Sequence, residues 1–318
     1  MKDNQSEINI IHSKLKEYDN IYILRHQRPD FDALGSQIGL YEILKKLYPN
    51  KQIHAIGNDN ITDFSFIAVN EKLNTLIKNS LIFILDTANI ERIEASKYEN
   101  IKDNNFIIKI DHHPNLEPYG NINIVDAKIS STSEIIYNIF IKNLKYTLTP
   151  AGAKGLYAGI YGDTGGFSYS NTSPQTFAIA SELVKYDFEF ENLMLNLKEL
   201  DDETVRALGW FYQNIEINNG LGILKFTKED LKKLPFSKSH LSLLVNFLGI
   251  FKSLKVWLLM VEHDNFIRVN LRSKKDINVS KIANKFEGGG HKNASGARIY
   301  KWEDSEKIIT EIQKIITK

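Results

Sequence analysis

The sequence predicts an α/β protein with a parallel-sheet N-terminal domain and a smaller α/β C-terminal domain. Two observations predict this class. In the first half, short and continuously apolar segments alternate with helical segments, which is typical of parallel strands covered on both faces. In the second half, strand-like segments with a hairpin-like break precede a glycine-rich segment and an amphipathic terminal helix. We expect a first domain at 1–185, a helical connector at 186–215 and a second domain at 216–318.

Four apolar segments of strand length define the expected sheet of the first domain. They are IYIL at 21–24, QIHAIG at 52–57, SLIFIL at 80–85 and NFIIKI at 105–110. Helices are expected between and after them, because apolar side chains recur at helical spacing and prolines stand near helix boundaries. These helices are expected at 33–49, 131–144 and 149–167.

The second domain is expected to begin with strands at 221–227 and 255–273, the latter interrupted by a hairpin at EHDN. Residues 279–300 predict a helix, a glycine loop and a strand. The terminal helix at 303–318 has an acidic first turn and a basic end, as the helix dipole prefers.

The composition excludes several classes of protein. The chain of 318 residues has a net charge of +1, which argues against coating long nucleic acids by bulk charge. It has no cysteine, so disulfides, thiolate metal sites and cysteine nucleophiles are excluded. We identify no signal-peptide core and no apolar run near the ~20 residues needed to span a bilayer. The sequence therefore predicts a cytoplasmic protein with no membrane segment.

Acidic side chains follow four separate apolar segments. Because the carboxyl ends of parallel strands share one edge of a sheet, these side chains are expected to converge there, together with neighbouring histidines. The residues in question are His26, Asp30, Asp32, Asp86, Asp111, His112, His113 and Asp163.

Converging carboxylates repel one another unless a cation lies among them. Five aspartates and up to three histidines are too many for one octahedral ion, but they suit two ions about 3.5–4 Å apart with a bridging carboxylate. Asp86 stands alone after its strand and is the expected bridge. Imidazole and carboxylate ligands without thiolate favour manganese over calcium, with Mg²⁺ or Co²⁺ as substitutes. A single strand-terminal Asp is usually a cap or turn residue, but four such segments in one chain favour a metal centre.

The segment EGGGHKNASGA at 287–297 is the second dense cluster. Consecutive glycines let backbone N–H groups approach an anion, and His291 adds a donor. The alternative is a tight loop with His291 exposed. Upstream, Arg268 and Arg272 alternate on one face of an expected edge strand, where they are either solvated or able to grip a phosphate or carboxylate.

These motifs resemble those of the DHH phosphoesterase superfamily. HQRPDFDALGS, LDTANIER, KIDHHPN and YAGIYGDTGGF stand in the family's order, and RSKKDINVSKIANKFEGGGHKNASGA resembles a DHH-associated domain of the first type. The resemblance covers nearly the whole chain. It is nearest to the nanoRNase type, which is a bifunctional oligoribonuclease and phosphatase of 3′-phosphoadenosine 5′-phosphate.

The resemblance implies a role for each matching residue. His26, Asp30 and Asp86 would hold one manganese, and Asp32, Asp86, His112 and Asp163 the other. His113 would face the scissile phosphate as a donor or general acid, and Asp111 would orient the neighbouring histidine. Arg272, the loop Gly288, Gly289 and Gly290, and His291 would bind the nucleotide across a cleft between the two domains; to these the alternation along the expected strand adds Arg268.

One position departs from the family pattern. Close relatives carry an arginine after GDTG, where this chain has Gly166. This leaves the substrate grip open, but not the metal centre. Phe167 and Tyr169 follow, and they are either base-stacking residues or core aromatics.

We therefore expect a manganese-dependent phosphoesterase that degrades very short single-stranded RNA and dephosphorylates 3′-phosphoadenosine 5′-phosphate. The alternative in the same class is a phosphodiesterase of cyclic or linear dinucleotides. A rival from another class is a nucleotide sensor with a decayed site, but this chain keeps every expected ligand. The family also suggests a homodimer, although no self-complementary surface can be identified in the sequence.

Overall fold

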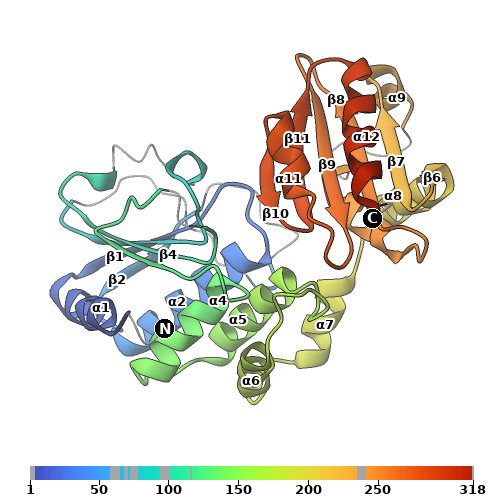
Figure 1. The fold of residues 1–318 in the computed structure, drawn as a ribbon. Coiled ribbons are helices and arrows are strands. Elements are labelled where there is room, and N and C mark those ends of the chain that lie inside the picture. Colours follow the sequence, from blue (N-terminus) through green and yellow to red (C-terminus); the bar gives the residue numbers. More distant parts are fainter. Residues whose placement is uncertain are drawn as a thin grey trace. The chain divides into compact units, whose positions relative to one another are not determined.

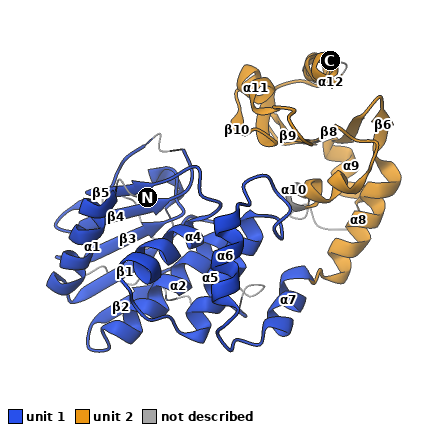
Figure 2. Cartoon of the chain, turned by 60° about the horizontal axis from the view of Figure 1, so that its bottom comes forward, with its two compact units in different colours: residues 1–198 blue, residues 199–318 orange. Residues whose placement is uncertain are grey.

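The computed structural model describes residues 4–57, 65–67, 71, 78–93, 101–114, 117–234 and 241–316. The chain divides into two compact units, Met1–Lys198 and Glu199–Lys318 (Figure 2). The predicted connector is divided between them. Helix α7 (Phe190–Lys198) ends the first unit, whereas α8 (Asp202–Asn214) packs Ala207, Leu208 and Phe211 into a core of the second. No helix among the described residues is long and apolar enough to cross a bilayer.

The first unit contains the predicted parallel sheet. Its five strands lie in the order β2-β1-β3-β4-β5, and every pairing is parallel. The strands are β1 (Asn20–Leu24), β2 (Gln52–Ala55), β3 (Leu81–Leu85), β4 (Phe106–Asp111) and β5 (Ile122–Val125). The central strand β3 is buried throughout, as its continuous apolar sequence predicts. The edge strand β5 was not predicted; its four residues alternate between buried and half-buried.

Helices cover one face of this sheet, and Figure 1 shows α2, α4 and α5 packed together there. The helices of this unit are α1 (Gln5–Glu17), α2 (Phe31–Leu47), α4 (Thr132–Ile136), α5 (Pro150–Asp163), α6 (Pro174–Leu183) and α7. The helix predicted at 131–144 begins as α4 and continues as a π-helical segment, η4 (Tyr137–Asn143). A smaller apolar cluster that includes Tyr22, Ile82 and Ile107 covers the other face.

Close contact between α2 and α5 depends on glycine. A Cβ atom at Gly35 would lie 2.3 Å from the carbonyl oxygen of Gly155, and one at Gly159 would lie 2.8 Å from an Asp32 carboxylate oxygen. The two backbones therefore approach more closely than larger side chains would allow. This approach brings the last residue of α5 to the first turn of α2.

The second unit contains a six-stranded mixed sheet in the order β10-β11-β9-β8-β7-β6. Its strands are β6 (Glu216–Asn218), β7 (Leu221–Phe226), β8 (Val256–Glu262), β9 (Ile267–Ser273), β10 (Gly289–His291) and β11 (Ala294–Ile299). Only β7 and β8 pair in parallel among the described strands. The hairpin predicted at EHDN joins β8 to β9.

Two apolar clusters cover the two faces of this second sheet. One includes α11 (Ser280–Ala283) and α12 (Ser305–Ile316), and the other includes α8, α9 (Lys228–Lys233), α10 (Leu241–Leu244) and the 3₁₀ segment η6 (Val245–Ile250). Short 3₁₀ segments are also found at η3 (Ile90–Arg92), η7 (Asn284–Phe286) and η8 (Trp302–Asp304).

Two expectations about the second unit were wrong. Strand β9 is not an edge strand, because β8 and β11 pair with it on either side. The glycine loop is in part a strand: Gly289, Gly290 and His291 form β10, which pairs with Ala294–Gly296 of β11. The sequence did not predict the hairpin of β10 and β11, because glycine is depleted in strands and its presence indicates a loop.

Candidate metal centre

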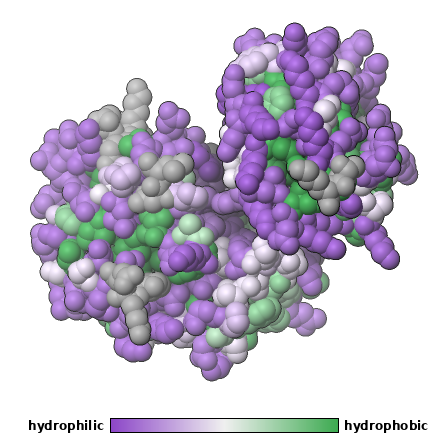
Figure 3. Space-filling view, in the orientation of Figure 1, coloured by the Kyte–Doolittle hydropathy of each residue, from purple (hydrophilic) through white to green (hydrophobic). Residues whose placement is uncertain are grey.

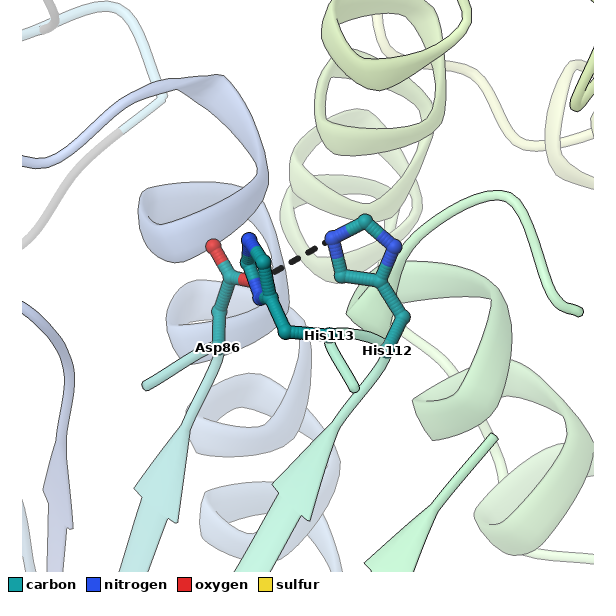
Figure 4. Close-up of side chains that lie close together, drawn as sticks. All are labelled: Asp86, His112 and His113. Carbon is teal, nitrogen blue, oxygen red and sulfur yellow. Dashed lines mark ion pairs between the residues drawn. The ribbon is translucent and has the colours of Figure 1, made fainter. Parts of the chain in front are cut away.

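The neighbouring strands β1, β3 and β4 place their carboxyl ends at one edge of the first sheet. His26 follows β1, Asp86 follows β3 directly, and Asp111 is the last residue of β4. His112 and His113 come next in the chain. Figure 4 shows Asp86 at the end of one strand, with both histidines at the end of the neighbouring strand turned toward it.

Helices α2 and α5 add three carboxylates to this edge. Asp30 caps α2, accepting hydrogen bonds from the backbone N–H groups of Asp32 and Ala33, and more than half of its side chain is exposed. Asp32 lies in the first turn of α2 and is completely buried. Asp163 is the last residue of α5. The strand ends and these two helices therefore bring all the predicted metal ligands together.

The ligand atoms form three overlapping groups in which every atom lies within 4.8 Å of the others. His26 Nε2 is 3.7 Å from Asp30 and 3.4 Å from Asp86. His112 Nε2 is 2.9 Å from Asp163 and 3.5 Å from Asp86. The groups are His26, Asp30 and Asp86; Asp32, His112 and Asp163; and Asp86, His112 and His113.

Asp86 and His112 connect these groups, because each belongs to two of them. Asp86 and His112 also lie close together, with His112 Nε2 3.5 Å from the Asp86 carboxylate. Nitrogen and oxygen donors at this spacing fit divalent cations of the first transition row, and the chain has no thiolate to favour a different ion. The division of the ligands between two ions stays a prediction.

Without cations, the charged side chains of the centre shift one another's pKa values. Burial lowers the pKa of His26, but hydrogen bonds to Asp30 and Asp86 outweigh this and raise it to about 10. His112 has a pKa of about 10, because Asp163 and Asp86 outweigh the same effect of burial. Burial and the neighbouring charges of Asp86 and Asp163 raise the pKa of Asp32. The Asp32 carboxylate is thus buried among like charges, as expected of a cation site, whereas His26 lowers the pKa of Asp30 against the effect of burial.

Asp86 itself has a strained backbone with φ of +50°. A non-glycine residue in this left-handed region costs roughly 1–2 kcal/mol. Contacts on both sides hold the turn in place. The Asp86 N–H donates to Ile110 O at 3.0 Å, the Thr132 hydroxyl donates to the Asp86 carboxylate at 3.2 Å, and the Tyr119 hydroxyl donates to Thr87 O at 2.7 Å. Strain held in this way at a functional turn orients the side chain.

His113 is bound to Asp111. Its Nδ1 lies 2.8 Å from Asp111 Oδ1, and its backbone N–H donates to the same oxygen at 3.1 Å. Burial raises the pKa of Asp111, but the hydrogen bond and charge of His113 outweigh it and leave the pKa below its usual value. Asp111 therefore acts on His113, whereas the resemblance left open which neighbouring histidine it orients.

Three supporting residues were not predicted from the sequence. The backbone N–H groups of Thr132 and Ser133 donate to Asp32 at 2.6 and 2.9 Å. Lys109 is completely buried on β4; its ammonium donates to Ala88 O and Glu117 O and lies 3.7 Å from Asp111 Oδ2. The available signals were the run STS before a helix and a lysine inside an apolar strand.

The predicted nucleotide-binding residues of the second unit largely share one face of its sheet. Arg272 and His291 both pair with Ala294, and Arg268 lies further along β9 on the same face. Arg272 Nε donates to Asn246 Oδ1 at 2.8 Å. Gly289 and His291 lie on this face of the sheet, whereas Gly290 between them lies on the other face. Their contact with a nucleotide, and the cleft between the domains, stay predictions.

The backbone requires glycine at two positions of the GGGH segment, for a different reason at each. A Cβ at Gly288 would lie 2.0 Å from the backbone oxygen of Gly296, and Gly290 has φ of +132°. After Asp163, the half-buried Phe167 packs against Tyr157, Tyr161 and Phe177, and its contact with a base stays a prediction. Tyr169 remains 53% exposed.

Comparisons with known proteins agree with this geometry. The model of the DHH family, N-terminal domain, matches residues 20–160, and that of the DHHA1 domain matches residues 236–318. The bifunctional oligoribonuclease and PAP phosphatase NrnA of Bacillus subtilis is 38% identical over 301 residues, which are 94% of this chain and 95% of the relative. This chain belongs to the DHH family.

Two further comparisons extend over the same length. The probable bifunctional oligoribonuclease and PAP phosphatase NrnA of Streptococcus mutans is 38% identical, over 96% of this chain and 97% of the relative. Among solved structures, an exopolyphosphatase-related protein from Bacteroides fragilis is 25% identical with a TM-score of 0.85, covering 98% of this chain and 97% of that one. This DHH protein thus has the domain content of NrnA-like phosphoesterases, with His/Asp clusters suited to divalent metals.

Proposed function

We propose that this DHH protein is a manganese-dependent phosphoesterase that degrades very short RNA to mononucleotides and converts 3′-phosphoadenosine 5′-phosphate to AMP. The observation that carries the proposal is the position of Asp86. It is shared by two groups of potential metal ligands at the end of the central strand and lies near a member of the third. The relatives named for oligoribonuclease and PAP phosphatase activity support the choice of substrate.

The ligands divide into two sets around Asp86. His26 and Asp30 would complete one ion's set, and Asp32, His112 and Asp163 the other. A pair of such ions lowers the pKa of water and stabilises the attacking and leaving oxygens of an in-line displacement. The protein's part is to hold these ligands rigidly, which the buried hydrogen bonds to Asp32 and Asp86 achieve.

His113 would donate a proton or hydrogen bond at the scissile phosphate. Asp111 engages its Nδ1, so Nε2 is the ring nitrogen through which it would act. The buried carboxylate fixes both the orientation and the tautomer of the ring, as carboxylate partners of catalytic histidines do. Asp111 would therefore act through His113 and not on the phosphate itself.

The second unit would bind the nucleotide through Arg272, Arg268, the backbone of the GGGH segment and His291. Arginine forks match phosphate geometry, and backbone N–H groups of glycines can approach an anion closely. The net charge of +1 suits a short ligand held by a few contacts better than a long polymer held by many.

The test is turnover with Mn²⁺ on a matched panel: an RNA dinucleotide, a five-nucleotide RNA, a twenty-nucleotide RNA, 3′-phosphoadenosine 5′-phosphate and a cyclic dinucleotide. We expect rapid loss of the two shortest RNAs and of the 3′-phosphate, with the long RNA spared. Rapid opening of the cyclic compound with little action on linear RNA would instead favour the cyclic dinucleotide phosphodiesterase.

A further inference from the structure

Arg92 lies at the edge of the candidate metal centre. It ends the 3₁₀ segment η3, whose backbone pairs with the residues after β1: the Gln27 N–H donates to Arg92 O at 2.7 Å, and His26 forms a bridge with Ile93. This pairing places the guanidinium beside the first ligand, with its Nη2 3.2 Å from His26 Nδ1.

The contact with His26 does not satisfy the guanidinium. His26 Nδ1 also lies 2.8 Å from Gln27 O, while Nε2 faces Asp30 and Asp86. For Nε2 to offer its lone pair to an ion, the proton must lie on Nδ1, where it is donated to Gln27 O. In that state Nδ1 has no lone pair for Arg92, so the guanidinium lies next to the centre with donors that the described residues do not use.

Arg92 also has no carboxylate partner among the residues that the structure describes. It forms no ion pair with an Asp or Glu there, and it is exposed. Exposed arginines are usually solvated. This one differs because the backbone pairing with Gln27 and Ile93 fixes its position at a cluster of metal ligands.

Neither the turn after Asp163 nor the buried Lys109 offers a cation for this role. The turn after Asp163, residues 164–171, has no basic side chain, and Gly166 stands where the family pattern expects arginine. Gly166 has φ of +63°, and a Cβ there would lie 3.1 Å from the Tyr161 ring. Lys109 is buried and directed at backbone carbonyls. Arg92 is thus an exposed cation that the described structure holds beside the first ligand, His26.

We propose that Arg92 binds the non-bridging oxygens of the substrate phosphate held at the metal centre. The proposal rests on the phosphoesterase function proposed above and deepens it by naming a phosphate-binding residue. The planar guanidinium can present two parallel N–H groups to a phosphate, so its fork would orient the phosphate as well as balance its charge. Arg92 would thereby supply the positive charge that the family pattern places at position 166, where this chain has glycine.

The test compares three variants: Arg92→Met, Arg92→Lys and the control Arg206→Met, which removes an exposed arginine from α8 of the other unit. Substrates are the RNA dinucleotide and bis(p-nitrophenyl) phosphate, a phosphodiester without a base. We expect Arg92→Met to lower kcat/KM by about 10–100-fold on both, as for the loss of a charged hydrogen-bonding group. Arg92→Lys should recover only part of this loss, and Arg206→Met should match the parent.

Binding measurements separate phosphate binding from support of His26. Titration of Mn²⁺ into the metal-free protein should give affinities within about threefold for Arg92→Met and the parent, since the ligand set is intact. AMP binding to the Mn²⁺-loaded protein should weaken by about tenfold or more. If Mn²⁺ affinity falls together with activity, Arg92 acts through His26 and the proposal is wrong.

The role of Arg92 can be tested whether or not RNA is the substrate. If the parent prefers a cyclic dinucleotide, the same variants are assayed on that compound, and a loss there still supports Arg92. Unchanged kcat/KM on every diester, with unchanged AMP binding, would overturn the proposal while leaving the phosphoesterase function standing. Circular dichroism of each variant confirms that the fold is retained.

Discussion

The two units hold their polar groups in opposite ways. In the first unit, Asp32, Asp86 and Asp111 are at most 1% exposed, and each has hydrogen-bonded or charged partners from neighbouring elements. In the second, Arg268 and His291 are exposed and Arg272 is half-buried, on the face of a sheet. Hydrophilic side chains also dominate the visible surface of this unit (Figure 3).

This difference indicates a division of labour. Buried, mutually braced side chains keep the geometry that a reaction needs, and their desolvation strengthens every charge interaction among them. Exposed side chains on a sheet can adapt to a ligand and contribute mainly to its affinity. We therefore expect changes at the buried, braced residues of the first unit to lower kcat and changes on the second sheet to raise KM.

The largest expected effect is that of Asp86→Ala. Removing the shared carboxylate should weaken metal binding at both sets of ligands and lower turnover by a factor on the order of 10³ or more. Nucleotide binding by the second unit should survive in part, which AMP binding would reveal. Asp126→Ala is the matched control, because Asp126 also follows a strand of the sheet but only forms a turn with Lys128. Turnover that survives Asp86→Ala would mean that the two-metal assignment is wrong.

The next effect concerns His113→Gln. Loss of a general acid should reduce kcat by about 10²–10³-fold while leaving KM and Mn²⁺ affinity nearly unchanged. The result also resolves an ambiguity in the structure, because His113 Nδ1 lies 3.5 Å from Asp86 and shares a ligand group with it. If Mn²⁺ affinity falls as steeply as kcat, His113 is a metal ligand and not the acid.

Arg272→Met should show the opposite pattern. Removing the guanidinium from the second sheet should raise KM for the RNA dinucleotide by about 10-fold, with kcat within about threefold of the parent. Lys225→Met is its control, since Lys225 lies on β7 and points to the opposite face of the same sheet. A fall in kcat with unchanged KM would place Arg272 in the chemistry and break the division between the units.

The strand-end chemistry was predictable because its signal is local. An apolar run followed by an acid predicts a buried strand and its carboxyl end in one short segment, as at Leu81–Asp86. Parallel topology then brings such ends together without further information. The same logic does not separate ligands from turn residues: Asp126 also follows a strand, yet it belongs to no group of metal ligands in the described residues.

What could not be predicted depends on contacts distant in the sequence. Thr132 and Ser133 support Asp32 across about 100 residues of chain, and their sequence reads only as a helix start. Strand β10 is hidden because glycine has no side chain whose pattern could reveal pairing. The place of Arg92 depends on a bridge between two loops, which no periodicity encodes.

The last prediction concerns the pH dependence of the metal-free fold and of metal binding. Without cations, His26 and His112 have pKa values of about 10, well above the ordinary value of 6.5, because carboxylates surround them. Raised pKa values stabilise the metal-free fold fully below about pH 6.5, and this contribution is lost as pH rises toward 10. The metal-free protein should therefore lose stability with increasing pH over this range, as unfolding in denaturant with EDTA would show.

Metal binding should follow the reverse trend. Each histidine must give up its proton to become a ligand, so every ion that engages one competes with a proton. Between pH 6.5 and 8.5 the apparent Mn²⁺ affinity should rise by up to about tenfold per pH unit for each proton displaced. Calorimetric titration in two buffers of different ionisation enthalpy counts those protons. If no proton is released, the histidines are already neutral before metal binds, and the carboxylates alone balance the charge of the ions. The first unit would then differ from the second in its buried carboxylates and not in charged histidines.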